Sequence, residues 1–199
     1  MAKGAPPFVG LTGGIGAGKS EALAALERLG AATLSTDAVV HELLASDEVR
    51  DLLVERFGDR VATDGRIDRT AVAEVVFEDP DERQWLEGVL WPRVGERMVA
   101  WREDALRHEP PPRALVVEVP LLFESGMEAA FDHTIAVVAD EQVREERAAA
   151  RGHAGVESRA ARQLNQKEKA ELAEYVVEND GDLAELERKL SSLLENIEP

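Results

Sequence analysis

The residues best suited to chemistry lie near the N-terminus, in the run Gly13-Gly14-Ile15-Gly16-Ala17-Gly18-Lys19-Ser20. It fits the pattern Gly-x-x-x-x-Gly-Lys-Ser, in which glycines let backbone N–H groups converge on phosphate oxygens that a Cβ would obstruct. The pattern assigns Lys19 to the β- and γ-phosphates of a nucleotide and the Ser20 hydroxyl to Mg²⁺. The alternative is a glycine turn without a ligand. The strand-like run before it and the helix-like run after it favour a phosphate loop.

Two acidic residues stand where a nucleotide site would use them. Asp37 follows the second predicted strand, at the end of a parallel sheet where ligands gather. Its carboxylate could accept a proton from an attacking hydroxyl or hold the metal, or it could simply be a helix N-cap. Glu118 is an acid at the end of an apolar run. It either orients Mg²⁺ through water or anchors a loop.

Basic side chains gather in residues 144–169, against an acidic background. They are Arg144, Arg147, Arg151, Arg159, Arg162, Lys167 and Lys169. Arg147 and Arg151 are one helical turn apart, so they could form an ordinary solvated face. The other interpretation is a clamp that neutralises charge on a phosphoryl group in transfer. The local positive charge favours the clamp for at least one of Arg147, Arg151 and Arg159.

The elements that must position these residues follow from apolar runs and glycines. The helix-like run 21–29 follows the loop and ends at Gly30, and another predicted helix follows Asp37. Strand–helix units in succession indicate a parallel sheet. Five runs are predicted as its strands: Phe8–Thr12, Ala32–Ser35, Ala114–Val119, Thr134–Val138 and Tyr175–Val177.

Residues 46–112 differ from the rest because amphipathic helices replace the alternating pattern. A long helical stretch from Trp85 to Ala105 contains Pro92, which must kink or restart it, and its tryptophans, Trp91 among them, are expected in the core. We therefore predict three parts. A nucleotide-binding core comprises residues 1–45, 113–143 and 170–199, a helical substrate lobe comprises 46–112, and a lid comprises 144–169.

Composition narrows the class of protein. The chain has 199 residues, a formal net charge of −17 and a pI near 4.6, which argues against broad electrostatic binding of nucleic acid or anionic membranes. The absence of cysteine excludes disulfides and thiolate metal sites. No apolar run reaches the roughly 18 residues of a membrane helix. We expect a cytoplasmic protein that acts on small molecules, with no nucleic-acid or membrane partner and no obligate protein partner implied.

With these motifs in place, the chain resembles the dephospho-coenzyme A kinases over nearly its whole length. The resemblance rests on Leu11–Ser20, on Phe57-Gly58 with Asp64–Arg69, on Glu118–Glu124 and on Asn179–Gly181. In addition, Arg147, Arg151, Arg159 and Gln163 match positions of the family's lid. There are departures from the family pattern. Ser35-Thr36-Asp37 replaces Asp-Ala-Asp, Trp91-Pro92 replaces His-Pro, Arg144 replaces Gln and Glu174 replaces Asp.

The resemblance implies transfer of the ATP γ-phosphoryl group to the ribose 3′-hydroxyl of dephospho-coenzyme A, on a P-loop NTPase-type α/β fold with a five-stranded parallel sheet flanked by helices, an inserted helical substrate lobe and a helical lid. It implies that Asp37, Lys19 and Arg147 are catalytic and that Ser20 binds Mg²⁺. The residues implied for ATP are Gly14, Ile15, Gly16, Ala17, Gly18, Lys19, Ser20, Glu21, Arg147, Arg151, Asn179 and Gly181. Those implied for the acceptor are Thr12, Asp37, His41, Arg69, Leu121, Glu124, Arg159 and Gln163.

The sequence is also compatible with two alternatives. The first is a nucleoside or nucleotide kinase on the same scaffold, because other phosphate-loop kinases share the first motif. The second is a nucleotide-dependent switch that has no small-molecule acceptor. The guanine-binding pattern Asn-Lys-x-Asp is absent from the sequence, which counts against a GTPase.

Overall fold

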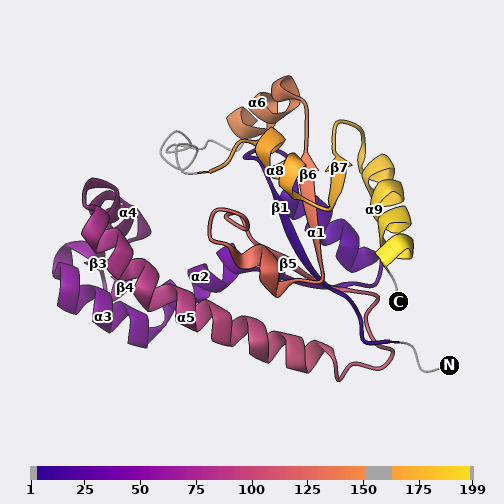
Figure 1. Ribbon diagram of the computed structural model, residues 1–199. Helices are drawn as coiled ribbons and strands as arrows, with labels where there is room; N and C mark the ends of the chain where they lie inside the picture. The colour runs from indigo at the N-terminus through magenta and orange to yellow at the C-terminus, as the bar shows by residue number, and fades with distance from the viewer. Residues whose placement is uncertain (1–3, 151–162, 198–199) are drawn as a thin grey trace. The chain divides into compact units, whose positions relative to one another are not determined.

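The computed structural model describes residues 4–150 and 163–197 (Figure 1). The chain divides into two compact units: residues up to Ser35 together with those from Arg102 onward, and Thr36–Trp101 between them. The second unit therefore begins one helix earlier than the lobe predicted at 46–112, and it ends before the proline-rich return. The assignment of the parts to core, substrate lobe and lid stays a prediction.

The first unit is built on the parallel sheet that the sequence predicts. Its strands lie in the order β2-β5-β1-β6-β7, and every neighbouring pair is parallel. Their bounds are β1 Phe8–Gly13, β2 Ala32–Ser35, β5 Leu115–Glu118, β6 His133–Val138 and β7 Tyr175–Glu178. Strand β1 is central, so the loop that follows it begins in the middle of the sheet.

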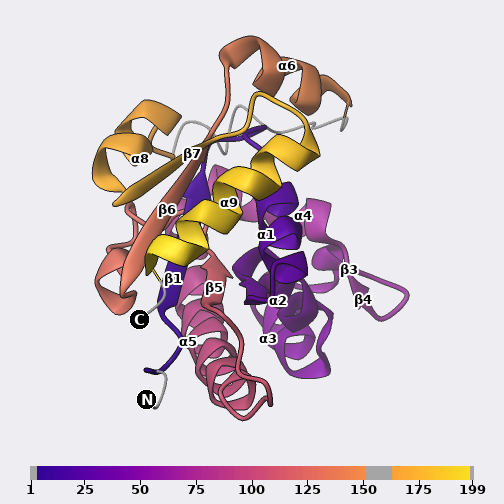
Figure 2. The ribbon, with the colours of Figure 1, turned by 90° about the vertical axis from the view of Figure 1, so that its right-hand side faces the viewer.

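Helices cover both faces of this sheet. Val9 and Leu11 of β1 face an apolar core shared with α1 (Lys19–Arg28) and α9 (Leu183–Ile197). Figure 2 shows α9 lying alongside α1 in front of the strands. Side chains alternate along a strand, so Thr12 points to the opposite face. There it meets α8 (Gln166–Leu172), which packs against β6 and β1.

The region predicted as a lid is described only in part. Helix α6 (Glu141–Ala150) follows β6, and α8 leads back to β7. A short 3-10 helix, η2 (Met127–Ala130), precedes β6. Arg151 and Arg159 lie outside the described residues, so their predicted roles stay predictions.

The second unit is mainly helical, as predicted. Its helices are α2 (Thr36–Ala45), α3 (Asp47–Phe57), α4 (Arg69–Glu78) and α5 (Pro80–Ala105), the last of which runs on into the first unit. The sequence interpretation missed a small hairpin of β3 (Ala62–Thr63) and β4 (Arg66–Ile67), which follows the 3-10 helix η1 (Asp59–Val61). Asp64 and Gly65 form its turn, both with positive φ, of 51° and 72°.

The structure narrows one expectation for α5 and overturns another. The helix contains Pro92 without interruption, so the proline does not restart it. Trp91, expected in the core, is 54 % exposed. The apolar positions that are buried lie on another side of the helix, where Leu86, Leu90 and Val94 recur at intervals of four residues.

Candidate active site

The glycine-rich segment between β1 and α1 forms a tight loop of unusual backbone geometry. Gly16 and Gly18 have φ values of 79° and 90°, a left-handed conformation that residues with a Cβ rarely adopt. Helix α1 starts at Lys19, so its N-terminal N–H groups face the loop. The Lys19 ammonium donates to the carbonyls of Gly13 and Gly14, both at 3.1 Å. The loop is therefore closed by its own lysine.

Other segments of the same chain pack so closely against this loop that its glycines have no room for side chains. A Cβ at Gly13 would lie 2.3 Å from the Val137 carbonyl oxygen, and one at Gly18 would lie 2.1 Å from Nδ2 of Asn179. Strand β6 and the segment after β7 therefore support the loop by direct contact. The sequence predicts a loop of this kind, in which backbone N–H groups meet an anion, and the structure supplies the left-handed glycines and the helix N-terminus it needs.

Asn179 joins the loop to a small pocket. Its side-chain amide donates to the Ala17 carbonyl at 2.9 Å, and its own carbonyl accepts from Nη1 of Arg147 at 2.9 Å. The pocket has a volume of about 220 Å³ and is lined by Glu21, Arg147, Asn179, Gly181, Leu183 and Leu186. The first four were predicted for ATP from separate stretches of sequence, and the fold brings them together.

Arg144 also packs over the loop, a contact that the sequence did not predict. Its carbonyl oxygen is 2.6 Å from the position of a Cβ on Gly16, and its Nη1 is 3.4 Å from that of a Cβ on Gly14. Within the described part of the chain, its buried Nε has no hydrogen-bond partner. The departure from glutamine at this position therefore places a guanidinium beside the phosphate loop.

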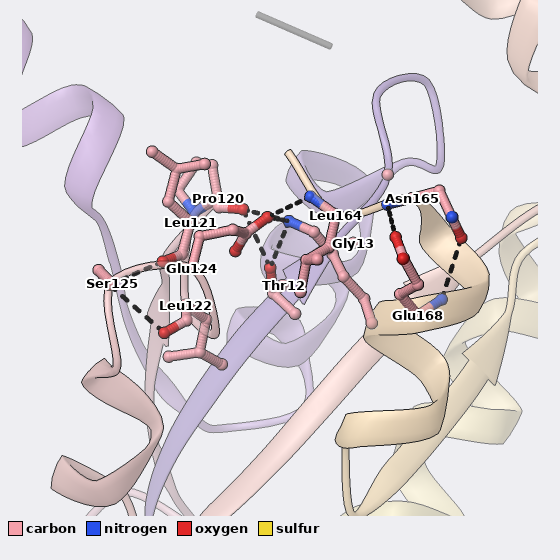
Figure 3. A network of polar contacts seen from close by, with 12 residues as sticks. Thr12, Gly13, Pro120, Leu121, Leu122, Glu124, Ser125, Leu164, Asn165 and Glu168 are labelled. Atoms are coloured by element: carbon pink, nitrogen blue, oxygen red, sulfur yellow. Dashed lines mark hydrogen bonds and ion pairs between the residues drawn. The ribbon is translucent and has the colours of Figure 1, made fainter. Parts of the chain in front are cut away.

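On the other face of the sheet, the buried Lys169 binds two of the residues predicted for the phosphoryl acceptor, Thr12 and Glu124. Both are labelled in Figure 3. Lys169 is completely buried, and its ammonium pairs with Oε1 of Glu124 at 3.0 Å. The same ammonium donates to Oγ1 of Thr12 at 3.4 Å and to the Pro120 carbonyl. A buried charge is tolerated only when it is paired and hydrogen-bonded, as this one is. The sequence interpretation counted Lys169 among the basic residues of the lid and gave it no role.

The residues of this unit that are predicted to bind the phosphoryl acceptor differ in whether their polar groups have hydrogen-bond partners. The Thr12 hydroxyl is fully buried and donates to the Pro120 carbonyl at 3.3 Å. Oε1 of Glu124 accepts from the Leu164 N–H at 2.8 Å, whereas its buried Oε2 has no partner among the described residues. Leu121 and Gln163 are half-buried next to this network. Acceptor binding by these residues stays a prediction.

The second unit carries the remaining acceptor residues. Nη1 of Arg69, at the start of α4, contacts the ring nitrogens of His41 on α2. Both side chains are exposed, so the pair presents a cation on the surface of this unit. Asp37 is exposed in the first turn of α2. The helix already begins at Thr36, so Asp37 is not its N-cap and the carboxylate is not used in that way.

Glu118 and Ser20 complete the residues considered for a metal. Glu118 is buried between its strand neighbours Leu11 and Ser35, and the choice between a water-mediated metal contact and a loop anchor stays open. Ser20 is exposed at the start of α1. No cluster of three acidic or histidine side chains suited to a metal occurs in residues 4–150 and 163–197. The exposed Ser20 hydroxyl at the start of α1 fits Mg²⁺, which typically takes one or two protein ligands and fills its other positions with phosphate oxygens and water.

Comparison with known proteins identifies the family. The family model described as dephospho-CoA kinase matches residues 7–185. A dephospho-CoA kinase of Synechococcus sp. (strain CC9902) is 38 % identical over 192 residues, covering 94 % of this chain and 94 % of the relative. A dephospho-CoA kinase of Deinococcus radiodurans is 38 % identical over 196 residues, covering 97 % and 93 %.

Solved structures give the same result for the fold. A crystal structure from Thermus thermophilus has a TM-score of 0.81 and 35 % identity, and the match covers 98 % of this chain and 100 % of that one. A dephospho-CoA kinase from Campylobacter jejuni has a TM-score of 0.65 at 21 % identity, covering 97 % and 98 %, and supports the fold alone. Taken with the phosphate loop and the pocket beside it, the match along most of the sequence shows that this chain belongs to the dephospho-CoA kinase family.

Proposed function

We propose that this chain transfers the γ-phosphoryl group of ATP to the ribose 3′-hydroxyl of dephospho-coenzyme A, giving coenzyme A and ADP. Family membership supports this reaction. The structural observation that carries the proposal is that Asn179 is hydrogen-bonded to the phosphate loop and also lines the adjoining pocket. The loop would hold the phosphates, and the pocket would hold the adenine of the same nucleotide.

The donor half of the reaction rests on backbone groups and two cations. The loop N–H groups and the N-terminus of α1 would bind the phosphate chain, and Lys19 would exchange its carbonyl contacts for the β- and γ-phosphates. Arg147, fixed by the Asn179 carbonyl, would lie over the nucleotide. Cations around the transferred group stabilise the charge that spreads over its oxygens.

Magnesium fits this site through Ser20. The Ser20 hydroxyl would hold the ion together with phosphate oxygens, and a bound Mg²⁺ neutralises charge on the β- and γ-phosphates. Use of magnesium is part of the proposal, as are a cytoplasmic location and the absence of a required protein partner. The described residues contain no helix long and apolar enough to cross a membrane.

Asp37 is proposed as the general base. An exposed carboxylate at the start of α2 is free to accept the proton of the attacking hydroxyl, and it is not used to cap its helix. Arg69 and His41 would bind the acceptor as an exposed cationic pair, since coenzyme A precursors carry phosphate groups. Asp37, His41 and Arg69 all belong to the second unit, which would thus supply both the base and a part of the acceptor site.

The decisive experiment measures ADP release with ATP and magnesium, with and without dephospho-coenzyme A. We expect release to depend on this acceptor and not on a panel of nucleosides and nucleotides. Acceptor-independent hydrolysis would instead support a nucleotide-dependent switch, and turnover with a nucleoside would support the other kinase.

Asp37→Asn tests the base with little change in shape. General-base catalysis is typically worth about 10²–10⁴ in rate, so kcat is expected to fall by about that factor. ATP affinity, measured by calorimetry, is expected to remain within about twofold because the loop is unaltered. A near-normal kcat would remove Asp37 from this role.

A further inference from the structure

The buried ammonium of Lys169 is a feature of the first unit that the proposed reaction does not use. It has three donors, and three acceptors surround it: Oε1 of Glu124, the carbonyl of Pro120 and the hydroxyl of Thr12. Its side chain is inaccessible to solvent. With every donor engaged inside the protein, Lys169 has no group left for a substrate, so any influence on the reaction acts through its partners.

Those partners belong to segments that are far apart in the sequence. Thr12 is the penultimate residue of β1, beside the phosphate loop, and Pro120 and Glu124 lie in the turn after β5. Glu124 reaches further, because the oxygen that binds Lys169 also accepts from the N–H of Leu164. Figure 3 shows these groups converging from the strand, the turn and the segment before α8.

The residues joined in this way are the ones implied for the acceptor. Thr12 and Glu124 bind the ammonium directly. Leu121 follows Pro120, and Gln163 precedes Leu164. Each of the acceptor residues that the structure describes in the first unit is therefore either a partner of the network or next to one in sequence.

We propose that Lys169 is a positioning residue for the acceptor side of the site. Its charge holds Glu124 and the turn after β5 against Thr12, and so fixes where the acceptor residues stand. The proposal rests on the proposed function, because it assumes that these residues bind dephospho-coenzyme A. Without the ammonium, the Glu124 carboxylate would be buried without a counter-ion and the turn would shift to reach water.

A purely structural lysine makes a different kinetic prediction. Loss of stability lowers the fraction of folded enzyme, which reduces the apparent kcat and leaves both KM values unchanged. Displacement of acceptor residues raises the KM for the acceptor instead. The two roles are therefore separated by the acceptor KM and not by total activity.

The experiment compares Lys169→Met with Lys167→Met, an exposed lysine on the same helix. For Lys169→Met we expect the KM for dephospho-coenzyme A to rise about tenfold or more, the size of one misplaced hydrogen bond to a charged group. ATP affinity from calorimetry is expected to stay within about twofold. Lys167→Met is expected to match the wild type, and near-ultraviolet circular dichroism checks that each variant is folded.

A second variant guards against misfolding and tests the pairing. Lys169→Met combined with Glu124→Gln leaves no buried charge, so it should recover thermal stability lost by the single variant. If Glu124 is held by Lys169, the double variant should show an acceptor KM close to that of the worse single variant. A KM equal to the product of the two single effects would overturn the proposal, since Glu124 would then act independently.

The remaining outcomes are equally informative. An unchanged acceptor KM in a folded Lys169→Met enzyme, with only kcat reduced, overturns the proposal and leaves the proposed function intact. A wild-type enzyme that binds ATP but does not phosphorylate dephospho-coenzyme A overturns the proposed function, and this proposal with it.

Discussion

The phosphate loop and the second unit offer their candidate binding groups in different ways. The loop offers backbone N–H groups, held by glycines with left-handed φ and no space for a Cβ, beside Val137 and Asn179. In the second unit, the candidate residues Asp37, His41 and Arg69 are exposed side chains on helices. A backbone site tolerates few substitutions, whereas a side-chain site can be altered one residue at a time. The departures from the family pattern at Ser35 and Trp91 lie outside the loop.

Among the variants that test this difference between the two regions, Gly13→Ala is expected to have the largest effect. The new Cβ would lie 2.3 Å from the Val137 carbonyl, which is part of the central sheet and cannot move away. We expect the free energy of unfolding to fall by about 3 kcal/mol and ATP binding to be lost. Chemical unfolding and calorimetry measure the two effects. A variant with wild-type stability and a normal heat of ATP binding would show that the loop adapts.

Arg69→Ala tests the lobe, with a smaller effect confined to one substrate. The substitution removes the proposed charge-assisted contact between the Arg69 guanidinium and a phosphate group of the acceptor. The KM for dephospho-coenzyme A is therefore expected to rise about tenfold. ATP affinity should not change, because Arg69 belongs to the other unit. Arg97→Ala, an exposed arginine on α5, is the control. Equal losses of affinity for both substrates would contradict the division of labour between the two regions.

Gly95→Ala gives the smallest effect and sharpens the contrast between the two regions. Gly95 lies inside α5, where a Cβ meets nothing within 4 Å. Alanine should therefore stabilise the protein by about 0.5–1 kcal/mol through its higher helix propensity, with kinetics unchanged. Denaturant unfolding measures the gain. Destabilisation by this substitution would mean that glycine in the lobe is required for the structure, as it is in the loop.

Local sequence signals were sufficient for most of the fold. Apolar runs located the five strands, and the run from Gly13 to Ser20 located the loop because its chemistry is contained in consecutive residues. The hairpin at Asp64-Gly65 was missed although its signal was present. Asp-Gly favours a two-residue turn with positive φ, but the strands on either side are only two residues long and show no alternation.

Residues defined by tertiary contacts could not be predicted. Lys169 lies among charged residues on a short helix, which indicates a solvated face, and its burial depends on Glu124 and Pro120 from another part of the chain. Arg144 is similar, because only the return of α6 over the loop places its guanidinium there. Continuous helix through Pro92 likewise reflects packing of the lobe overriding local propensity.

Because Gly18 and Asn179 are in close contact, substitutions at these two positions are expected to depend on each other. The space that a methyl group at position 18 would fill already holds the Asn179 amide nitrogen, which is also bonded to Ala17. A mutation that enlarges position 18 would therefore need a smaller residue at 179, and its side chain would in addition have to tolerate a φ of 90°. We therefore expect substitutions at position 18 to occur only together with a change at 179, and a redesign of the pocket at Asn179 has to consider both positions.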